Sequence, residues 1–117
     1  AVLKTTRMGY DGRGQAVIRA PEEAEAAFAR LAPHPLVLEG FVPFTHELSA
    51  VAARGADGAL AVFEASENRH AGGILDVSLV PAGVPAAAAE EARRLVARVA
   101  EGLELVGVVA LEMFLLP

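Results

Sequence analysis

A glycine-rich loop between two short apolar segments constrains the fold of this chain more than any other sequence feature. Residues 2–4 and 16–18 have strand composition, and the loop at residues 9–15 between them holds three glycines within six positions. Its Asp11-Gly12 pair favours a chain reversal. We therefore predict an antiparallel hairpin. Its loop can bring backbone amides close to an anion, because glycine has no Cβ to keep a ligand away.

The loop matches neither of the two common glycine motifs for phosphate binding. The lysine and the serine or threonine of a P-loop are missing after Gly14. A dinucleotide fingerprint would need a glycine at Val17 and a helix after the loop, where this sequence predicts a strand. Two interpretations remain from the residues alone. The loop either folds over phosphates with Lys4 and Arg13 nearby, or is a hairpin turn that needs glycine for positive φ.

The rest of the chain alternates short strands with two helices. The first helix is expected to begin at Pro21, which lacks the amide proton that a first helical residue does not need. The second is expected over residues 86–101, with Gly102 near its end. The apolar faces predicted from helical spacing are Ala24, Ala27, Phe28 and Leu31 for the first helix, and Ala92, Leu95, Val96, Val99 and Leu103 for the second.

Further strands are expected on both sides of a break at residues 39–43, where glycine and proline interrupt the pattern. The order β-β-α-β, a hinge, and then β-β-β-α-β indicates an α+β fold with two lobes, residues 1–38 and residues 39–117. The strands after the first hairpin are predicted at residues 36–38, 48–53, 60–63, 74–80 and 106–116, with a turn at residues 57–58 and the last strand buried.

Composition and charge exclude several classes of function. The absence of cysteine excludes a disulfide scaffold, a thiolate nucleophile and a zinc ribbon. The net charge of -5 argues against a broad nucleic-acid footprint. The charge is unevenly distributed, since residues 1–20 hold four basic side chains and one acidic side chain. A small anionic ligand near the glycine loop therefore remains possible.

The two ends of the sequence carry a further expectation. The chain opens on Ala1 and an apolar segment without a Met, and it closes on an apolar run, whereas most domains end in polar residues. We expect both ends to be cuts, with partner strands outside the sequence. No apolar run of membrane-spanning length and no charged-then-apolar leader occurs, so we expect a cytoplasmic protein that contacts no membrane.

Residues 3–15, Leu-Lys-Thr-Thr-Arg-Met-Gly-Tyr-Asp-Gly-Arg-Gly-Gln, closely resemble the nucleotide-binding flap of the 5-(carboxyamino)imidazole ribonucleotide synthetases, which are ATP-grasp enzymes of purine biosynthesis. Thr6 departs from this pattern, because the family commonly has an arginine there. Further matches follow in order and cover nearly the whole chain except the two helices. They include residues 39–44, 47–49, 53–58, 67–70, 73–78, 81–82, 106–108 and 112–114.

The resemblance implies an ATP-grasp fold with ATP held between two α+β lobes. It implies that Lys4 and the loop bind the phosphates, that the segment around the hinge contacts adenine, that Glu47 binds ribose, and that His70 contacts ATP. The residues expected to bind ATP are Lys4, Gly9, Tyr10, Asp11, Gly12, Arg13, Gly14, Gln15, Glu39, Gly40, Phe41, Val42, Glu47 and His70. Without the resemblance, Glu47 would be interpreted as a solvated residue at a strand start, and His70 as a surface residue after a turn.

Two other residues are candidates for the chemistry itself. Glu112 lies within an apolar run, where a buried carboxylate needs a cation or hydrogen bonds. Magnesium prefers oxygen ligands, so Glu112 is the candidate metal ligand, unless it lies on the exposed face of an edge strand. Arg54 could supply positive charge to a phosphoryl or bicarbonate oxygen as a catalytic residue, although pairing with Asp57 is the simpler interpretation.

The resemblance implies an enzyme that uses ATP and magnesium to carboxylate 5-aminoimidazole ribonucleotide with bicarbonate through carboxyphosphate. It also implies a homodimer and a second metal ligand beyond residue 117, so that these residues alone are expected to bind nucleotide weakly and to show no turnover. Two alternatives remain open: another ATP-grasp carboxylase or ligase, and an α+β module that only binds nucleotide or mediates association.

Overall fold

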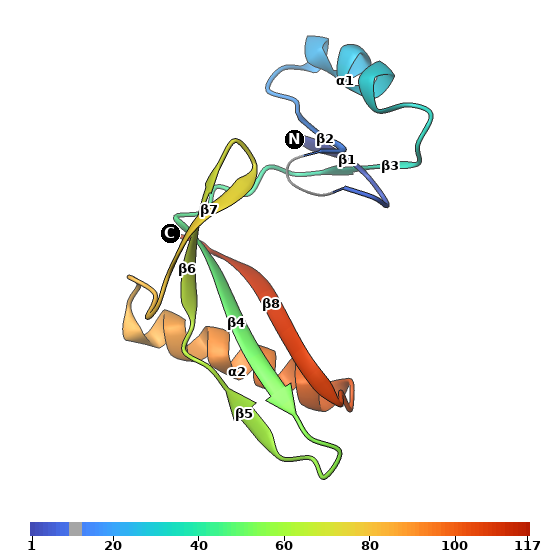
Figure 1. Ribbon diagram of the computed structural model, residues 1–117. Helices are drawn as coiled ribbons and strands as arrows, with labels where there is room; N and C mark the ends of the chain where they lie inside the picture. Colours follow the sequence, from blue (N-terminus) through green and yellow to red (C-terminus); the bar gives the residue numbers. More distant parts are fainter. Residues whose placement is uncertain (10–12) are drawn as a thin grey trace. The chain divides into compact units, whose positions relative to one another are not determined.

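The computed structural model describes residues 1–9 and 13–117, and these residues form two compact units (Figure 1). The first unit comprises Ala1–Val42 with Ala71–Ile74, and the second comprises Pro43–His70 with Leu75–Pro117. Each unit combines a helix with antiparallel strands, which confirms the α+β class. The lobe boundary expected after residue 38 stays a prediction.

The first unit is a three-stranded sheet with a short helix. Its strands are β1 (Val2–Thr5), β2 (Gln15–Val17) and β3 (Leu36–Glu39), in the order β2-β1-β3. Both pairings are antiparallel, with Leu3 opposite Ala16 and Leu38, so the predicted hairpin is confirmed.

The first helix differs in part from its prediction. A 3₁₀ turn, η1 (Pro21–Glu23), precedes α1 (Ala24–Leu31). Of the predicted apolar face, Ala27 and Leu31 are buried against Leu3 and Ala16, whereas Ala24 is exposed and Phe28 is 59% exposed. The prediction was therefore wrong for Ala24 and Phe28, because α1 contacts the sheet along a narrow i, i+4 stripe.

The second unit is built around the long strand β4 (His46–Arg54). Strand β8 (Gly107–Leu115) pairs with β4 along its whole length, from His46 opposite Leu115 to Arg54 opposite Gly107. On the other edge of β4 lie two shorter strands, β5 (Leu60–Val62) and β6 (Ser66–Ala71), and β7 (Ile74–Leu79) follows β6.

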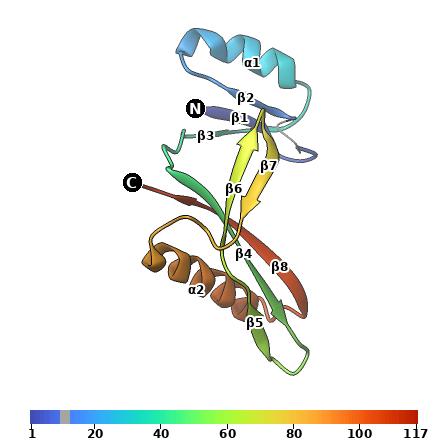
Figure 2. The same ribbon diagram turned by 60° about the vertical axis from the view of Figure 1, so that its left-hand side comes forward.

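Helix α2 (Ala86–Gly102) packs on one face of this second sheet, as both views show (Figure 2). Side chains alternate along β4, and Leu48, Ala50 and Ala52 are buried. Small residues dominate the core, which allows the helix to approach the strands closely. The core consists of Ala50, Ala52, Ala65, Ala92, Val96 and Ala100.

Several elements expected in the second unit need correction. Helix α2 ends at Gly102 as expected, but Leu103 lies beyond it and is 70% exposed. The last strand exists, but Val108 and Phe114 are exposed, so it is not a buried strand among the described residues. Strand β6 was not predicted at all. In the part of the chain that the structure describes, no helix is long and apolar enough to cross a membrane.

Candidate functional site

The face of the second sheet opposite α2 carries a cavity of about 480 Å³. The alternation along β4 that points Leu48 and Ala50 into the core points Glu47 and Ser49 to this opposite face. Polar side chains from four strands line the cavity: Glu47, Ser49, Asn68, His70, Ser78 and Glu112.

Strand register explains why these polar residues meet. Glu47 lies opposite Asn68 on one side and Phe114 on the other. Two positions along β4, Ser49 lies opposite Ser66 and Glu112. Two adjacent cross-strand rows therefore face the cavity, and side chains as far apart in sequence as Asn68 and Glu112 can touch.

Glu47 and His70 form a close pair in this cavity. His70 Nδ1 lies 3.0 Å from Glu47 Oε2, and about a third of each side chain is exposed. A carboxylate with a second oxygen available can accept two hydrogen bonds, while an imidazole can donate one. The pair can therefore recognise a ligand that offers neighbouring hydroxyl groups.

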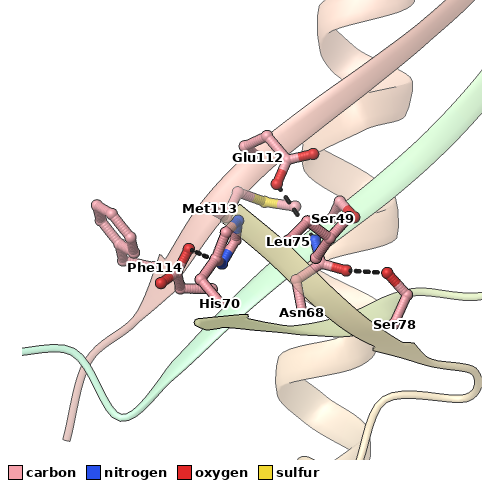
Figure 3. Close-up of a pocket in the computed structure, with 9 residues that line it drawn as sticks. Ser49, Asn68, His70, Leu75, Ser78, Glu112, Met113 and Phe114 are labelled. Atoms are coloured by element: carbon pink, nitrogen blue, oxygen red, sulfur yellow. Dashed lines mark hydrogen bonds and ion pairs between the residues drawn. The ribbon is translucent and has the colours of Figure 1, made fainter. Parts of the chain in front are cut away.

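Glu112 is anchored through Asn68. The Asn68 amide nitrogen donates to Glu112 Oε2 at 3.3 Å and to Ser49 Oγ at 2.8 Å, and Ser78 Oγ donates to Asn68 Oδ1 at 2.8 Å (Figure 3). Glu112 itself is an exposed residue on β8. Of the two alternatives left open by the sequence, the structure shows the exposed face of an edge strand, because alternation on β8 turns Leu111 toward the core and Glu112 to the cavity face.

Apolar side chains complete the cavity wall. Leu75, Met113 and Phe114 line it together with the polar groups. The ring of Phe114 stacks on that of Phe44, with centroids 4.3 Å apart and ring planes 7° apart. Phe44 lies just before β4, so its stack on Phe114 holds the chain segment that leads into Glu47 against β8. Such a wall suits a flat apolar ligand group.

A second cavity, of about 410 Å³, lies within the first unit at the glycine loop. Its lining includes the cations Lys4, Arg7 and Arg13 together with Gly9 and Gln15. Thr5 N donates to the Gly14 carbonyl at 2.8 Å, which closes the base of the loop. Of the predicted loop residues, Tyr10, Asp11 and Gly12 lie outside the described residues.

Gly14 is required by the geometry of this loop. Its φ is +72°, a conformation that residues with a Cβ rarely adopt. A Cβ there would also lie 2.6 Å from Thr5 Oγ1. The alternative that this loop is a turn needing positive φ is therefore correct for Gly14, and phosphate binding by the loop stays a prediction.

Lys4 and Glu39 are brought together by the pairing of β1 with β3. Lys4 Nζ lies 2.6 Å from Glu39 Oε2, and both side chains are partly exposed. An exposed pair of this kind contributes at most about 1 kcal/mol, so an anionic ligand can compete for Lys4. Gly40, Phe41 and Val42 follow Glu39 in the same unit. Adenine binding by residues 39–42 stays a prediction.

Arg54 is not brought to the cavity. It ends β4 opposite Gly107, whereas Glu47 begins β4 opposite Phe114. Its Nη1 donates to the Leu105 carbonyl at 3.1 Å, and Asp57 Oδ1 accepts from the Ala59 amide. The guanidinium therefore joins the β4 end to the segment before β8. This structural role is the one that the geometry favours over the catalytic role.

The residues present fit a magnesium ion in part. Among residues 1–9 and 13–117, no group of three or more His, Asp or Glu side chains is placed to hold a metal. Magnesium usually takes only one or two carboxylates and completes its shell with water and substrate phosphates. Glu112 can supply one such carboxylate at the cavity.

Glu67 is buried on the face of β6 that looks away from the cavity, directly opposite Leu48, and it holds the segment after β7. It accepts from Arg69 Nε at 2.9 Å and from the Gly83 amide at 3.2 Å. The hydrogen bond from Arg69 lowers the pKa of Glu67 below its ordinary value. Burial raises this pKa, but the charge of Arg69, the hydrogen bond from the Gly83 amide and the charge of His46 also lower it, so the net shift is downward.

No motif in the sequence predicts Ser49, Asn68 or Ser78 as a site residue, yet all three line the cavity. All three are uncharged, and Asn68 and its neighbours were interpreted as a turn rather than as strand β6. No local pattern marks them, because the polar stretch at residues 66–70 fits a turn as well as a strand.

Comparison with known proteins decides the family. The model of the ATP-grasp domain matches residues 1–117. The chain belongs to the ATP-grasp family. Membership confirms the fold that the resemblance of residues 3–15 implied.

Similar ATP-grasp proteins share one name. The chain is 47% identical over 114 residues to an N5-carboxyaminoimidazole ribonucleotide synthase of Pseudomonas aeruginosa, covering 97% of this chain and 31% of that protein. It is 44% identical over 115 residues to the synthase of Bacillus subtilis, covering 98% of this chain and 30% of that protein.

Solved structures of proteins with this name have a similar fold. An ADP complex of N5-carboxyaminoimidazole ribonucleotide synthetase superposes with a TM-score of 0.90 at 40% identity, over 97% of this chain and 30% of that one. The synthetase from Thermus thermophilus superposes with a TM-score of 0.83 at 46% identity, over 98% of this chain and 31% of that one. The chain thus spans about 30% of the length of the relatives that it matches.

Proposed function

We propose that this chain is part of an enzyme that carboxylates 5-aminoimidazole ribonucleotide with bicarbonate at the expense of ATP. Relatives at 47% and 44% identity bear the name of the enzyme that makes the N5-carboxylated ribonucleotide. A similar chain, at 40% identity, is described as an ADP complex. These names support ATP as the energy source and the ribonucleotide as the acceptor.

The observation that carries the proposal is the placement of three polar groups around one cavity. Glu47 and His70 are in contact at one end, and Glu112 enters from β8 in the adjacent row. We assign Glu47 to the ribose hydroxyls, His70 to the nucleotide, and Glu112 to one magnesium ligand. Phe114 and its stacked partner Phe44 provide an apolar surface beside them.

The glycine loop and Lys4 are assigned to the phosphates. Lys4 and Arg13 supply positive charge at the loop cavity. Lys4 must exchange its contact with Glu39 for a phosphate oxygen. Because the pair with Glu39 is partly exposed and weak, this exchange costs little.

In the proposed reaction, a bicarbonate oxygen attacks the γ-phosphorus of ATP. The bond between that phosphorus and the β,γ-bridging oxygen breaks, so that ADP leaves and carboxyphosphate forms. The amine of the ribonucleotide then attacks the carboxyl carbon, releasing phosphate and a proton. Such phosphoryl transfer needs positioning and charge neutralisation rather than a protein nucleophile. Bound magnesium would neutralise phosphate charge, and a closed loop would protect carboxyphosphate from water.

Steady-state assays of ADP release by the full-length protein test this proposal. ADP release is expected to require both bicarbonate and the ribonucleotide, with carboxylated ribonucleotide formed in equal amount. Lys4→Ala should lower kcat/KM for ATP at least tenfold, while Arg98→Ala on α2, away from both cavities, should leave it unchanged. Release that depends on a different acceptor would instead indicate another ATP-grasp ligase. Nucleotide binding without any turnover would indicate a binding module.

We also propose a homodimer in the cytoplasm that binds small molecules only. The homodimer follows from the family resemblance of residues 3–15. The negative overall charge argues against nucleic acid as a partner. Light scattering of the full-length protein should give twice the mass of one chain.

A further inference from the structure

Asn68 lies at the centre of a hydrogen-bond network that joins four strands at the cavity of the second unit. Only 7% of the residue is exposed. Its amide nitrogen donates to Ser49 Oγ on β4 and to Glu112 Oε2 on β8. Its Oδ1 accepts from Ser78 Oγ on β7 at 2.8 Å and from Ser66 Oγ on β6 at 3.4 Å. Figure 3 shows Asn68 between Glu112 and Ser78.

This network engages both the nitrogen and the oxygen of the amide. Both protons of the nitrogen are engaged. The oxygen accepts from Ser78 Oγ and, at 3.4 Å, from Ser66 Oγ, whose single proton is shared with the Ser49 carbonyl oxygen, also at 3.4 Å. The direction of the amide is fixed by chemistry, because an ionised carboxylate only accepts. A rotated amide would place Oδ1 against Glu112 Oε2, with two acceptors in contact and no proton between them.

The serines hold the amide in this direction. Ser49 Oγ and Ser66 Oγ are 2.8 Å apart, and Ser78 Oγ contributes the shortest contact to Oδ1. Within the part of the chain that the structure describes, Asn68 is the hydrogen-bond partner of Glu112, and Oε1 of Glu112 has none. Asn68 therefore determines which oxygen of Glu112 is engaged and which remains available for a ligand.

We propose that Asn68 is a positioning residue for Glu112. By holding Oε2, it fixes the carboxylate so that Oε1 is offered as the single oxygen ligand to the divalent cation that accompanies the nucleotide. The proposal rests on the proposed function, because it takes the cation and the nucleotide from there. Groups that orient a ligand in this way commonly contribute tenfold to a hundredfold to metal affinity.

Metal binding by the full-length protein tests this role without relying on turnover. The affinity of the protein–ADP complex for Mn²⁺, a paramagnetic substitute for magnesium, is measured by electron paramagnetic resonance. The affinity for ADP in the absence of metal is measured by calorimetry. The variants are Asn68→Leu and Ser78→Ala, and the control is Glu101→Gln, which removes an exposed carboxylate from α2.

Asn68→Leu is expected to weaken Mn²⁺ binding about tenfold and to leave metal-free ADP affinity within about twofold, as expected for a residue that does not contact the nucleotide. Ser78→Ala should weaken Mn²⁺ binding about threefold, since it removes the shortest hydrogen bond to Oδ1 and so holds the Asn68 side chain less firmly. The control should match the wild type in both measurements.

Other results would overturn the proposal. Unchanged Mn²⁺ affinity in Asn68→Leu would do so, as would an equal loss of metal-free ADP affinity, which would indicate a merely structural role. If Asn68→Leu does not fold, wild-type Mn²⁺ affinity in Ser78→Ala contradicts the proposal. A wild-type protein that binds ADP but no Mn²⁺ contradicts this inference and the magnesium assignment of Glu112, but not the assignment of the cavity to the nucleotide. A wild-type protein that binds no ADP contradicts the proposed function and this inference together.

Discussion

His70 Nδ1 lies 3.0 Å from Glu47 Oε2, so strands β6 and β4 join a base and an acid at the edge of one cavity. The two residues are diagonal neighbours, because Glu47 is directly opposite Asn68 and His70 lies two positions beyond Asn68. This diagonal contact orders Glu47 before any ligand binds. The ring also stands beside the oxygens that would accept ribose hydroxyls.

His70→Ala should weaken binding of ADP to the full-length protein about fivefold, the equivalent of one lost hydrogen bond of about 1 kcal/mol. It removes both a ligand contact and the group that orders Glu47. Calorimetry measures the change. The matched control is His34→Ala, an exposed histidine after α1, which should bind ADP like the wild type. Equal affinities for His70→Ala and the control would show that the pair has no part in binding.

Gly14→Ala should destabilise the glycine loop and weaken nucleotide binding. The substitution forces an alanine into φ +72° and places its Cβ 2.6 Å from Thr5 Oγ1, a cost of about 1–3 kcal/mol. Hydrogen exchange of the β1–β2 hairpin measures the local effect. Gly102→Ala is the control, since nothing lies within 4 Å of a Cβ there and no positive φ is involved. Wild-type exchange rates in Gly14→Ala would contradict the conformational requirement.

Glu67→Gln should remove a pH-dependent part of the stability. Because Arg69 lowers the folded-state pKa below the ordinary 4.5, the ionised carboxylate stabilises the fold above pH 4.5. This contribution is lost as pH falls through the lowered value. In urea unfolding, Glu67→Gln should therefore be less stable than the wild type at pH 7, and the difference should shrink as the pH falls below 4.5 through the lowered pKa.

The control for Glu67 is Glu64→Gln, which removes a carboxylate from an exposed neighbouring position. If both variants change the unfolding free energy in the same way at every pH, the contacts of Glu67 with Arg69 and Gly83 are not the cause. A difference for Glu67→Gln that grows at low pH would also contradict the assigned direction.

Val96→Ala should lower the free energy of unfolding of the second unit by about 2 kcal/mol, through lost burial and a residual cavity. Val96 is fully buried and is the largest side chain in a core otherwise made of alanines. Leu103→Ala is the control, because Leu103 is 70% exposed and should cost less than about 0.5 kcal/mol. Urea unfolding compares the two. Equal losses would show that α2 is not packed as described.

The elements with local signals could be predicted from the sequence. The glycine loop, the Asp57-Gly58 turn and the apolar stripe of residues 86–101 each mark structure through nearby residues, and β1–β2, β4–β5 and α2 all form there. Strand β6 has no such signal. Its residues Asn68 and His70 line a cavity and Glu67 and Arg69 are charged, so neither face shows apolar alternation.

The candidate site depended on information that spacing does not contain. Glu47, His70 and Glu112 were expected from the family resemblance, and only the register of β4 with β6 and β8 explains how they meet. Register is set by tertiary pairing, not by local pattern. Asn68 could not be singled out, because its importance lies in partners on three other strands.

The cavity lined by Glu47, His70 and Glu112 is proposed to bind the nucleotide. Calorimetric titration of the full-length protein with ADP and magnesium compares the wild type with Glu47→Gln. The variant keeps the size of the side chain but removes the charge and one strong acceptor. We predict at least tenfold weaker binding for Glu47→Gln, with stability near that of the wild type. Equal affinity of the two proteins for ADP would contradict the assignment of this cavity.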